Sequence, residues 1–166
     1  MWHKVFALLL CCLSSTVTSA QDPVATIPAF SFSRVDKAIF TNENLSKGRM
    51  VFFVFFDTEC DHCRHAIEYL GQHQNDFSKT AIYLITLENT SRSIPFIIKN
   101  GNNLLGKNNV MLLQDTQSEF IKKFRPRKYP SMFLFSGKQQ LLLYDDEPGH
   151  LQKFAQFVSK PSYREG

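Results

Sequence analysis

An apolar run that leads directly into a pair of closely spaced cysteines constrains this chain most. The run, Met50–Phe56, is followed by a C-x-x-C made by Cys60 and Cys63. Such an uninterrupted run is typical of a central strand covered by helices on both faces. Beyond Cys63, apolar residues recur at helical spacing, so a helix is expected to begin near Cys60. The cysteine pair is therefore predicted to lie where a buried strand ends and a helix starts.

The rest of the chain alternates between strand and helix patterns. Strands are predicted at residues 30–33, 38–41, 81–87, 109–113, 132–135 and 141–144, and helices at 93–99, 116–124 and 151–158. Ser93 is expected to cap the first of these helices, and Thr116 to Glu119 fits a capping box for the second. This order predicts an α/β fold with a central mixed sheet flanked by helices.

The domain organisation that follows is simple. One domain is expected over residues 29–160, opening with an N-terminal hairpin, after an extended segment at 21–28 and before a tail at 161–166. Residues 1–20 differ from the rest, since Val5–Leu13 is apolar and Thr18-Ser19-Ala20 offers small residues for a signal peptidase. The apolar stretch is shorter than the roughly 20 residues that a membrane span needs.

The N-terminal pattern predicts a cleaved signal peptide at residues 1–20 and export to the periplasm or another extracytoplasmic compartment. No stable membrane insertion is expected after its removal. Cys11 and Cys12 leave lipid anchoring open, although Leu10 is not the small residue that a lipoprotein signal has before its Cys. An uncleaved N-terminal anchor is the other alternative.

Removal of residues 1–20 would leave two of the four cysteines, Cys60 and Cys63. A disulfide across two intervening residues closes almost no loop and constrains the unfolded chain little. Secreted domains that depend on disulfides have several cysteines at long spacings instead. A chemical role for the pair is therefore favoured over a structural one.

The charge pattern gives no sign of a nucleic-acid partner. The formal net charge of +4 comes from Lys and Arg scattered among Asp and Glu. The densest basic cluster, Arg125, Arg127 and Lys128, is short. It is interpreted as a solvated loop, with attraction of acidic partners as the alternative.

The position of the cysteines suggests their chemistry. The first turn of a helix has free backbone N–H groups and the positive end of the helix dipole, which stabilise a thiolate. Cys60, at the helix start, is expected to be the exposed nucleophile. Cys63 lies one turn further in, where it can attack a mixed disulfide and release the partner.

With these features the chain resembles the thioredoxin superfamily, and in particular its extracytoplasmic TlpA/ResA-like thiol:disulfide oxidoreductases. The resemblance rests on the strand Val51–Phe56, the Cys60-Asp61-His62-Cys63 centre, the following helix, and Tyr129-Pro130 before a hairpin and a terminal helix. It covers roughly residues 28–160. It implies a thioredoxin-like fold with an N-terminal hairpin and a helix-strand insertion at 93–113.

The resemblance also implies roles for individual residues. Cys60 would attack and Cys63 would resolve, while Pro130 would be a cis-proline facing the pair and exposing the Tyr129 backbone to a substrate strand. The implied activity is disulfide exchange with extracytoplasmic protein thiols, by a monomer that is served by an upstream redox partner. No organic cofactor and no metal are implied, because the electrons reside in the Cys60–Cys63 disulfide.

The sequence departs from the thioredoxin pattern around the thiols. Val54 occupies the position of the buried acid that helps thioredoxins deprotonate the second cysteine, and Glu59 replaces a frequent Trp. Asp57, Glu59 or Glu88 could take over the proton transfer, and the alternative is that all three are ordinary solvated carboxylates. His62 is expected to tune the thiolate by charge or hydrogen bonding, unless it is merely exposed.

Two other classes of function stay open at this point. Cys60 and Cys63 with His62 or His65 could bind copper or zinc, although structural zinc usually takes four ligands. A non-catalytic thioredoxin-like interaction domain is the other alternative. Peroxidase activity is disfavoured, because the Pro and Thr spacing that frames a peroxidatic Cys is absent around Cys60. Whether an enzyme of this kind reduces, oxidises or isomerises depends on its reduction potential and its partner.

Overall fold

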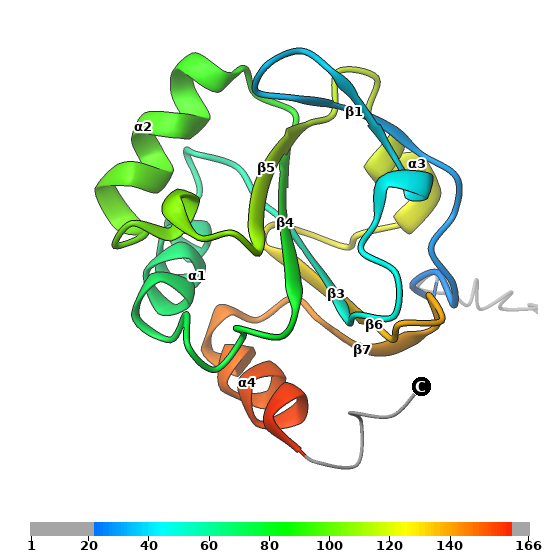
Figure 1. Ribbon diagram of the computed structural model, residues 1–166. Coiled ribbons are helices and arrows are strands. Elements are labelled where there is room, and N and C mark those ends of the chain that lie inside the picture. The colour runs from blue at the N-terminus through cyan, green and yellow to red at the C-terminus, as the bar shows by residue number, and fades with distance from the viewer. Residues whose placement is uncertain (1–21, 161–166) are drawn as a thin grey trace, which may run out of the picture.

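The computed structural model describes residues 22–160, and these form a seven-stranded mixed sheet with helices on both faces (Figure 1). The strands are β1 (Ser31–Arg34), β2 (Ile39–Thr41), β3 (Val51–Phe55), β4 (Ala81–Thr86), β5 (Val110–Gln114), β6 (Ser131–Phe135) and β7 (Leu141–Asp145). Their order in the sheet is β2-β1-β5-β4-β3-β6-β7, with β3, β4 and β5 parallel and every other neighbouring pair antiparallel. The predicted α/β fold class and its N-terminal hairpin are confirmed.

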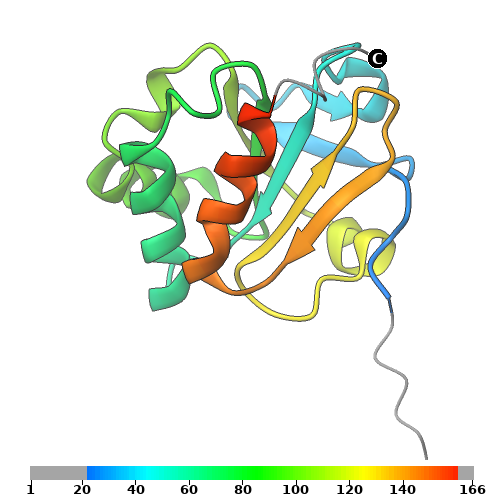
Figure 2. The same cartoon turned by 90° about the horizontal axis from the view of Figure 1, so that it is seen from below.

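The helices cover the two faces of the sheet unequally. They are α1 (Asp61–Gln72), α2 (Thr90–Asn100), α3 (Glu119–Phe124) and α4 (Leu151–Ser159), with short 3-10 turns η1 (Asn42–Asn44), η2 (Leu104–Gly106) and η3 (Pro148–His150). Figure 2 shows α1 and α4 beside each other on one face and α3 on the opposite face. α2 packs on the same face as α1, since Ile97 joins the core that lies under both helices.

The central strand β3 explains why the apolar run is unbroken. It pairs with β4 on one side and β6 on the other, and all five of its residues are buried. Phe52 and Val54 belong to the core under α1, whereas Phe53 and Phe55 belong to the core under α3. Phe53 has aromatic neighbours at ring-centroid distances of 5.3–6.1 Å, namely Phe30, Tyr83, Phe120, Phe124 and Phe135. β3 is thus paired on both edges and packed on both faces. The loop that follows its carboxyl end therefore starts from a fixed position in the sheet.

The extended segment at 21–28 lies against the outer edge of β7, as far as it is described. Thr26 forms an isolated bridge with Gln140, and the Leu141 N–H donates to the Ala25 carbonyl at 2.8 Å. Within residues 22–160, no helix is long and apolar enough to cross a membrane. The predicted signal peptide at 1–20 and the tail at 161–166 lie outside the described residues.

Helix α2 begins earlier than the sequence pattern predicted. Its N-cap is Asn89 instead of Ser93, and the Asn89 side chain accepts the Arg92 N–H at 3.3 Å. Ser93 is buried inside the helix, where its hydroxyl donates to the Asn89 carbonyl at 3.1 Å. Asn is as good an N-cap as Ser, so local preference alone did not distinguish the two positions.

The predicted capping box at Thr116 to Glu119 is wrong. α3 begins at Glu119, directly after Ser118, which has a left-handed backbone (φ 54°) and makes no side-chain cap. The carboxylate of Asp115 takes this part instead, accepting the N–H groups of Glu119 at 3.0 Å and Phe120 at 2.7 Å. Asp115 is itself buried, so its charge is compensated by the helix start that it caps.

We expect Asp115→Ala to lower the free energy of unfolding by about 2–3 kcal/mol, because buried N–H groups lose a charged acceptor. Thr116→Ala is the matched control, since Thr116 is exposed and should change stability by less than about 0.5 kcal/mol. Urea titration followed by circular dichroism measures both. Equal losses in the two variants would restore the capping box predicted from the sequence.

Candidate active site

The two cysteines lie at the start of α1, directly beyond the end of β3. Cys60 is the N-cap of the helix and is half-buried, and its Sγ accepts the Cys63 N–H at 3.3 Å. Cys63 is fully buried behind it, at 0 % exposure. Both side chains are free thiols in this structure. One sulfur therefore reaches the surface while the other is held in the interior one turn away.

Burial is the main reason that the pKa of the Cys63 thiol is raised well above its ordinary value. The hydrogen bond with the Cys60 side chain raises it further, as do the negative charges of Cys60 and Asp57. The Asp57 N–H, which points at the Cys63 Sγ from 3.5 Å, acts in the opposite direction. Cys63 is thus a protonated thiol at neutral pH.

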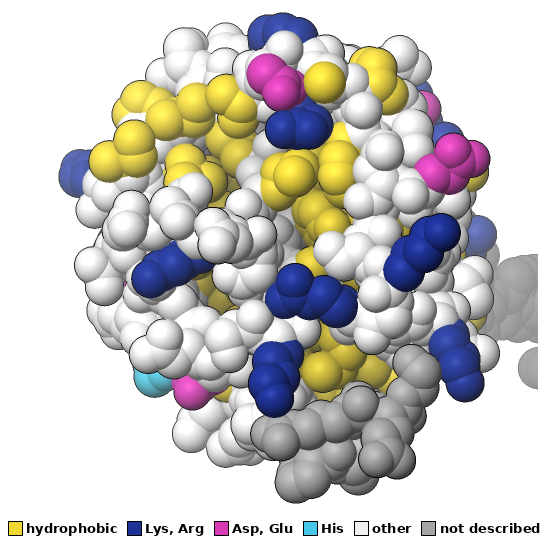
Figure 3. All heavy atoms as spheres, viewed as in Figure 1, with side chains coloured by type: hydrophobic (Ala, Val, Ile, Leu, Met, Phe, Trp, Pro, Cys, Tyr) yellow, Lys and Arg dark blue, Asp and Glu magenta, His cyan; other side chains and the backbone are white. Residues whose placement is uncertain are grey.

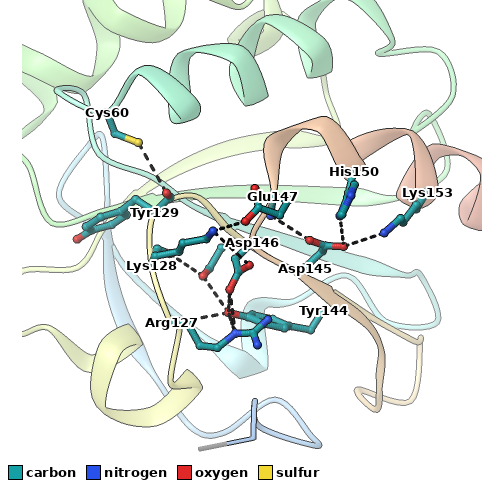
Figure 4. Close-up of polar contacts among 11 residues, drawn as sticks. Cys60, Arg127, Lys128, Tyr129, Tyr144, Asp145, Asp146, Glu147, His150 and Lys153 are labelled. Carbon is teal, nitrogen blue, oxygen red and sulfur yellow. Dashed lines mark hydrogen bonds and ion pairs between the residues drawn. The ribbon is translucent and has the colours of Figure 1, made fainter. Parts of the chain in front are cut away.

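The loop that carries Tyr129 and Pro130 faces Cys60 from the neighbouring strand β6. The Tyr129–Pro130 peptide bond is cis, and Pro130 is buried. The Tyr129 carbonyl oxygen lies 3.8 Å from the Cys60 Sγ, a weak sulfur hydrogen bond (Figure 4). The β3–β6 pairing sets Ser131 opposite Phe55, so the residue after Pro130 lies beside the residue five before Cys60.

Tyr129 itself is half-buried and packs on the end of β3. Its ring lies 4.7 Å from that of Phe55, between centroids. Burial, followed by the charge of Asp57, raises the pKa of the Tyr129 phenol to about 12. The negative charges of Cys63, Glu88 and Asp115 add to this effect. The phenol therefore stays neutral at physiological pH.

The three carboxylates that could replace a buried acid have different surroundings. Val54, at the expected position of that acid, is fully buried in the apolar core. Of Asp57, Glu59 and Glu88, Asp57 is the one whose charge acts on the Cys63 thiol. The Asp57 side chain also accepts the Glu59 N–H at 2.8 Å, which fixes the turn before Cys60.

Glu88 and Glu59 are joined through a residue that the sequence analysis did not single out, Arg92. Glu88 accepts the Thr58 N–H at 2.9 Å and pairs with Arg92 at 3.2 Å. Arg92 in turn pairs with the exposed Glu59. The spacing of Glu88 and Arg92, four residues apart across a helix start, was a signal for this pair. Both glutamates therefore hold the loop directly before Cys60, through Thr58 and Arg92.

His62 lies exposed on the first turn of α1, and within residues 22–160 no hydrogen bond joins its ring to either thiol. His62 contributes, after Lys128 and His150, to lowering the pKa of Glu147 in the segment before η3. His65 is likewise exposed and contacts Arg64 at 3.1 Å. The described part of the chain holds no group of three or more His, Cys, Asp or Glu side chains arranged as metal ligands.

Asp115 is a neighbour of the site that the sequence analysis did not identify, although its position just after a predicted strand was a signal for it. It directly follows β5, as Asp57 follows β3 by two residues and Glu88 follows β4 by two. The carboxyl ends of parallel strands meet at one edge of a sheet, where sites of α/β proteins lie. Three carboxylates thus gather at the edge where α1 starts.

An apolar groove of about 480 Å³ lies elsewhere, between α2, β5 and the β1–β2 turn. It is lined by Ile94, Leu105, Val110 and Leu112, with Arg34 and Asp36 at its rim. Figure 3 shows hydrophobic side chains along this face, with Lys and Arg side chains around them. Neither cysteine lines the groove, so it is separate from the thiol site.

Comparison with solved structures supports the fold. A putative thiol:disulfide interchange protein DsbE from Chlorobium tepidum matches with a TM-score of 0.66 and 14 % identity, over 84 % of this chain and 99 % of that one. Peroxidoxin BcpB from Mycobacterium tuberculosis matches with a TM-score of 0.67 and 11 % identity, over 84 % and 97 %. A secreted disulfide oxidoreductase from Mycobacterium tuberculosis, homologous to E. coli DsbE, matches with a TM-score of 0.63 and 15 % identity, over 78 % and 94 %.

At these identities the structural matches establish the thioredoxin-like fold alone. No curated protein sequence matches the chain. The sequence profile of the AhpC/TSA family, however, matches residues 24–143, which include the whole sheet except the last two residues of β7. The predicted membership of the thioredoxin superfamily is confirmed, while the finer TlpA/ResA-like assignment stays a prediction. The chain therefore belongs to the AhpC/TSA family, a group of thioredoxin-like thiol oxidoreductases.

Proposed function

We propose that the protein exchanges disulfides with protein thiols outside the cytoplasm through its Cys60-Asp61-His62-Cys63 centre. The observation that carries this proposal is the asymmetry of the two thiols: Cys60 is half-exposed at the N-cap of α1, and Cys63 is buried one turn behind it. The chemical distinction between an attacking and a resolving thiol needs this arrangement. No organic cofactor or metal takes part in the proposed reaction.

In the proposed reaction, the Cys60 thiolate attacks one sulfur of a substrate disulfide and releases the other as a thiolate. Cys63 then loses its proton and attacks the Cys60 sulfur, which forms the Cys60–Cys63 disulfide and releases the second substrate thiolate. The substrate gains two electrons and the protein loses two. An upstream redox partner returns the pair to its starting state, and the same steps run backwards when the protein acts as an oxidant.

The backbone around Tyr129 is the proposed contact for the substrate strand. Its carbonyl already lies beside Cys60, and Pro130 directly precedes β6, where its missing N–H breaks no ladder hydrogen bond. An extended substrate segment could pair with this backbone and bring its disulfide to the sulfur. Tyr129 and Pro130 are therefore proposed as substrate-binding residues, and His62 as an exposed neighbour that adjusts the charge around the centre.

We expect Cys60 to be alkylated well before Cys63 when the reduced protein meets iodoacetamide at neutral pH. The raised pKa of Cys63 keeps it protonated, so its alkylation should accelerate only at a pH above the ordinary thiol value of 9.0. Peptide mass mapping after timed quenching measures both rates. In the Cys63→Ala variant, Cys60 should attack a disulfide of oxidised RNase or insulin and form a persistent mixed disulfide, because no second thiol releases the substrate. Preferential labelling of Cys63 at neutral pH would reverse the proposed roles.

Asp57 is the proposed acceptor of the Cys63 proton, because its charge acts on that thiol and Val54 cannot do this work. Asp57→Asn should slow release of the mixed disulfide by about 10²-fold and leave the first attack by Cys60 nearly unchanged. The variant keeps an oxygen for the Glu59 N–H, so the turn is preserved. Rapid acid quenching of a single turnover separates the two steps. Glu59→Gln is the control, and a loss in that variant as large as in Asp57→Asn would count against Asp57.

The extracytoplasmic setting of the proposal rests on the residue pattern at 1–20 and on a secreted protein of similar fold. When the full chain is expressed in a secreting host, the exported protein should begin at Gln21. N-terminal sequencing or intact mass measures this. Protein that retains residues 1–20, or that carries a lipid at Cys11 or Cys12, would replace free export with membrane anchoring.

A further inference from the structure

The loop that presents Tyr129 to Cys60 is held from behind by side chains at the end of β7. The phenol oxygen of Tyr144 accepts the Arg127 backbone N–H at 3.2 Å and lies 3.4 Å from the Arg127 Nε. The same oxygen is 3.2 Å from the Ser131 Oγ, which donates to the Lys128 carbonyl at 2.7 Å. One hydroxyl thus lies at the centre of contacts to residues on both sides of Tyr129.

A buried carboxylate completes this network. Asp146 is only 8 % exposed, and its Oδ2 accepts the Tyr144 hydroxyl at 3.2 Å. The same oxygen pairs with the Arg127 Nε at 2.8 Å, and Oδ1 lies 3.8 Å from the Lys128 Nζ. A buried carboxylate is costly to leave unpaired, so Asp146 favours the loop conformation that keeps both cations beside it.

The Arg127 guanidinium also lies over the Tyr144 ring, with its carbon 4.9 Å from the ring centroid. Figure 4 shows the consequence for the loop. The side chains of Arg127 and Lys128 point to the β7 end, whereas the Tyr129 carbonyl points to Cys60. The loop is therefore anchored to the end of β7 by its charged side chains, and its main chain at Tyr129 is left facing Cys60.

We propose that Tyr144 and Asp146 are positioning residues for the docking of protein substrates. They hold the backbone of residues 127–129 in the position beside Cys60 where a substrate strand would pair with it. Neither side chain touches a sulfur. This inference rests on the proposed exchange function. It assigns a role to a buried carboxylate and a phenol that the two-thiol reaction does not itself use.

The proposal separates two kinds of substrate. A protein disulfide such as that of insulin needs the backbone of the loop, whereas a small disulfide such as 2-hydroxyethyl disulfide needs only the Cys60 sulfur. Loosening the loop should therefore raise KM for insulin and leave the reaction with the small disulfide unaffected. A role in overall stability alone would lower both rates together.

The test is Tyr144→Phe in the protein expressed from the full sequence. Loss of the hydroxyl should lower kcat/KM for insulin reduction by about tenfold, mainly through KM, because several hydrogen bonds to the loop are lost. The rate with 2-hydroxyethyl disulfide and the pH profile of Cys60 alkylation should stay within about twofold of the wild type. Tyr83→Phe, which removes a phenol hydroxyl in the middle of β4, is the matched control and should change none of these readouts.

Arg127→Ala keeps the inference testable if Tyr144→Phe does not fold, since the Arg127 side chain is 52 % exposed. It should reproduce the selective loss with insulin. In the double variant, the two losses should be less than additive, because both act through the same contacts. Equal losses with insulin and the small disulfide, or no loss with insulin, would overturn the inference. A wild-type protein that reduces neither disulfide would instead count against the proposed function.

Discussion

The burial of β3 on both of its faces is the constraint on which the rest of this structure depends. Every residue of the strand is buried, with β4 and β6 on its edges and two separate aromatic-rich cores above and below it. A strand held in this way cannot shift in register without exposing large apolar side chains, and each such exposure costs about 1.5–3 kcal/mol. The end of β3, and with it the start of α1, therefore has one position relative to β6.

That fixed position turns two chemically identical thiols into unequal ones. Cys60 caps α1 at the surface, where its sulfur meets the Tyr129 carbonyl, and Cys63 is withdrawn into the core under the helix. Burial of Cys63 disfavours its thiolate, so a base is needed when it acts, and the usual interior position is filled by Val54. We propose Asp57, on the loop between β3 and α1, as that base, because its charge acts on the Cys63 thiol.

Two sets of polar contacts hold the segments that surround Cys60. Glu88 and Arg92 hold the loop before it through Thr58 and Glu59, and Tyr144 and Asp146 hold the loop opposite through Arg127 and Lys128. Neither set touches a sulfur. Glu88 and Asp146 are the less exposed members, and their contacts with backbone N–H groups or paired cations define loop positions that apolar packing alone leaves free.

The sequence by itself determined the order of elements and the placement of the cysteines between a strand and a helix. The resemblance to the thioredoxin superfamily added that Tyr129-Pro130 faces the cysteines. Periodicity and local propensity predict the elements, because both are properties of a few neighbouring residues. Only the tertiary structure decided that Asp115 caps α3, that Asn89 caps the start of α2, and that Glu88 holds the loop before Cys60 through the Thr58 N–H. These outcomes depend on which polar groups meet after the strands pair, across separations such as the 30 residues between Thr58 and Glu88. Local sequence patterns do not encode such distant contacts. The network around Tyr144 and Asp146 therefore follows only from the pairing of β6 with β7.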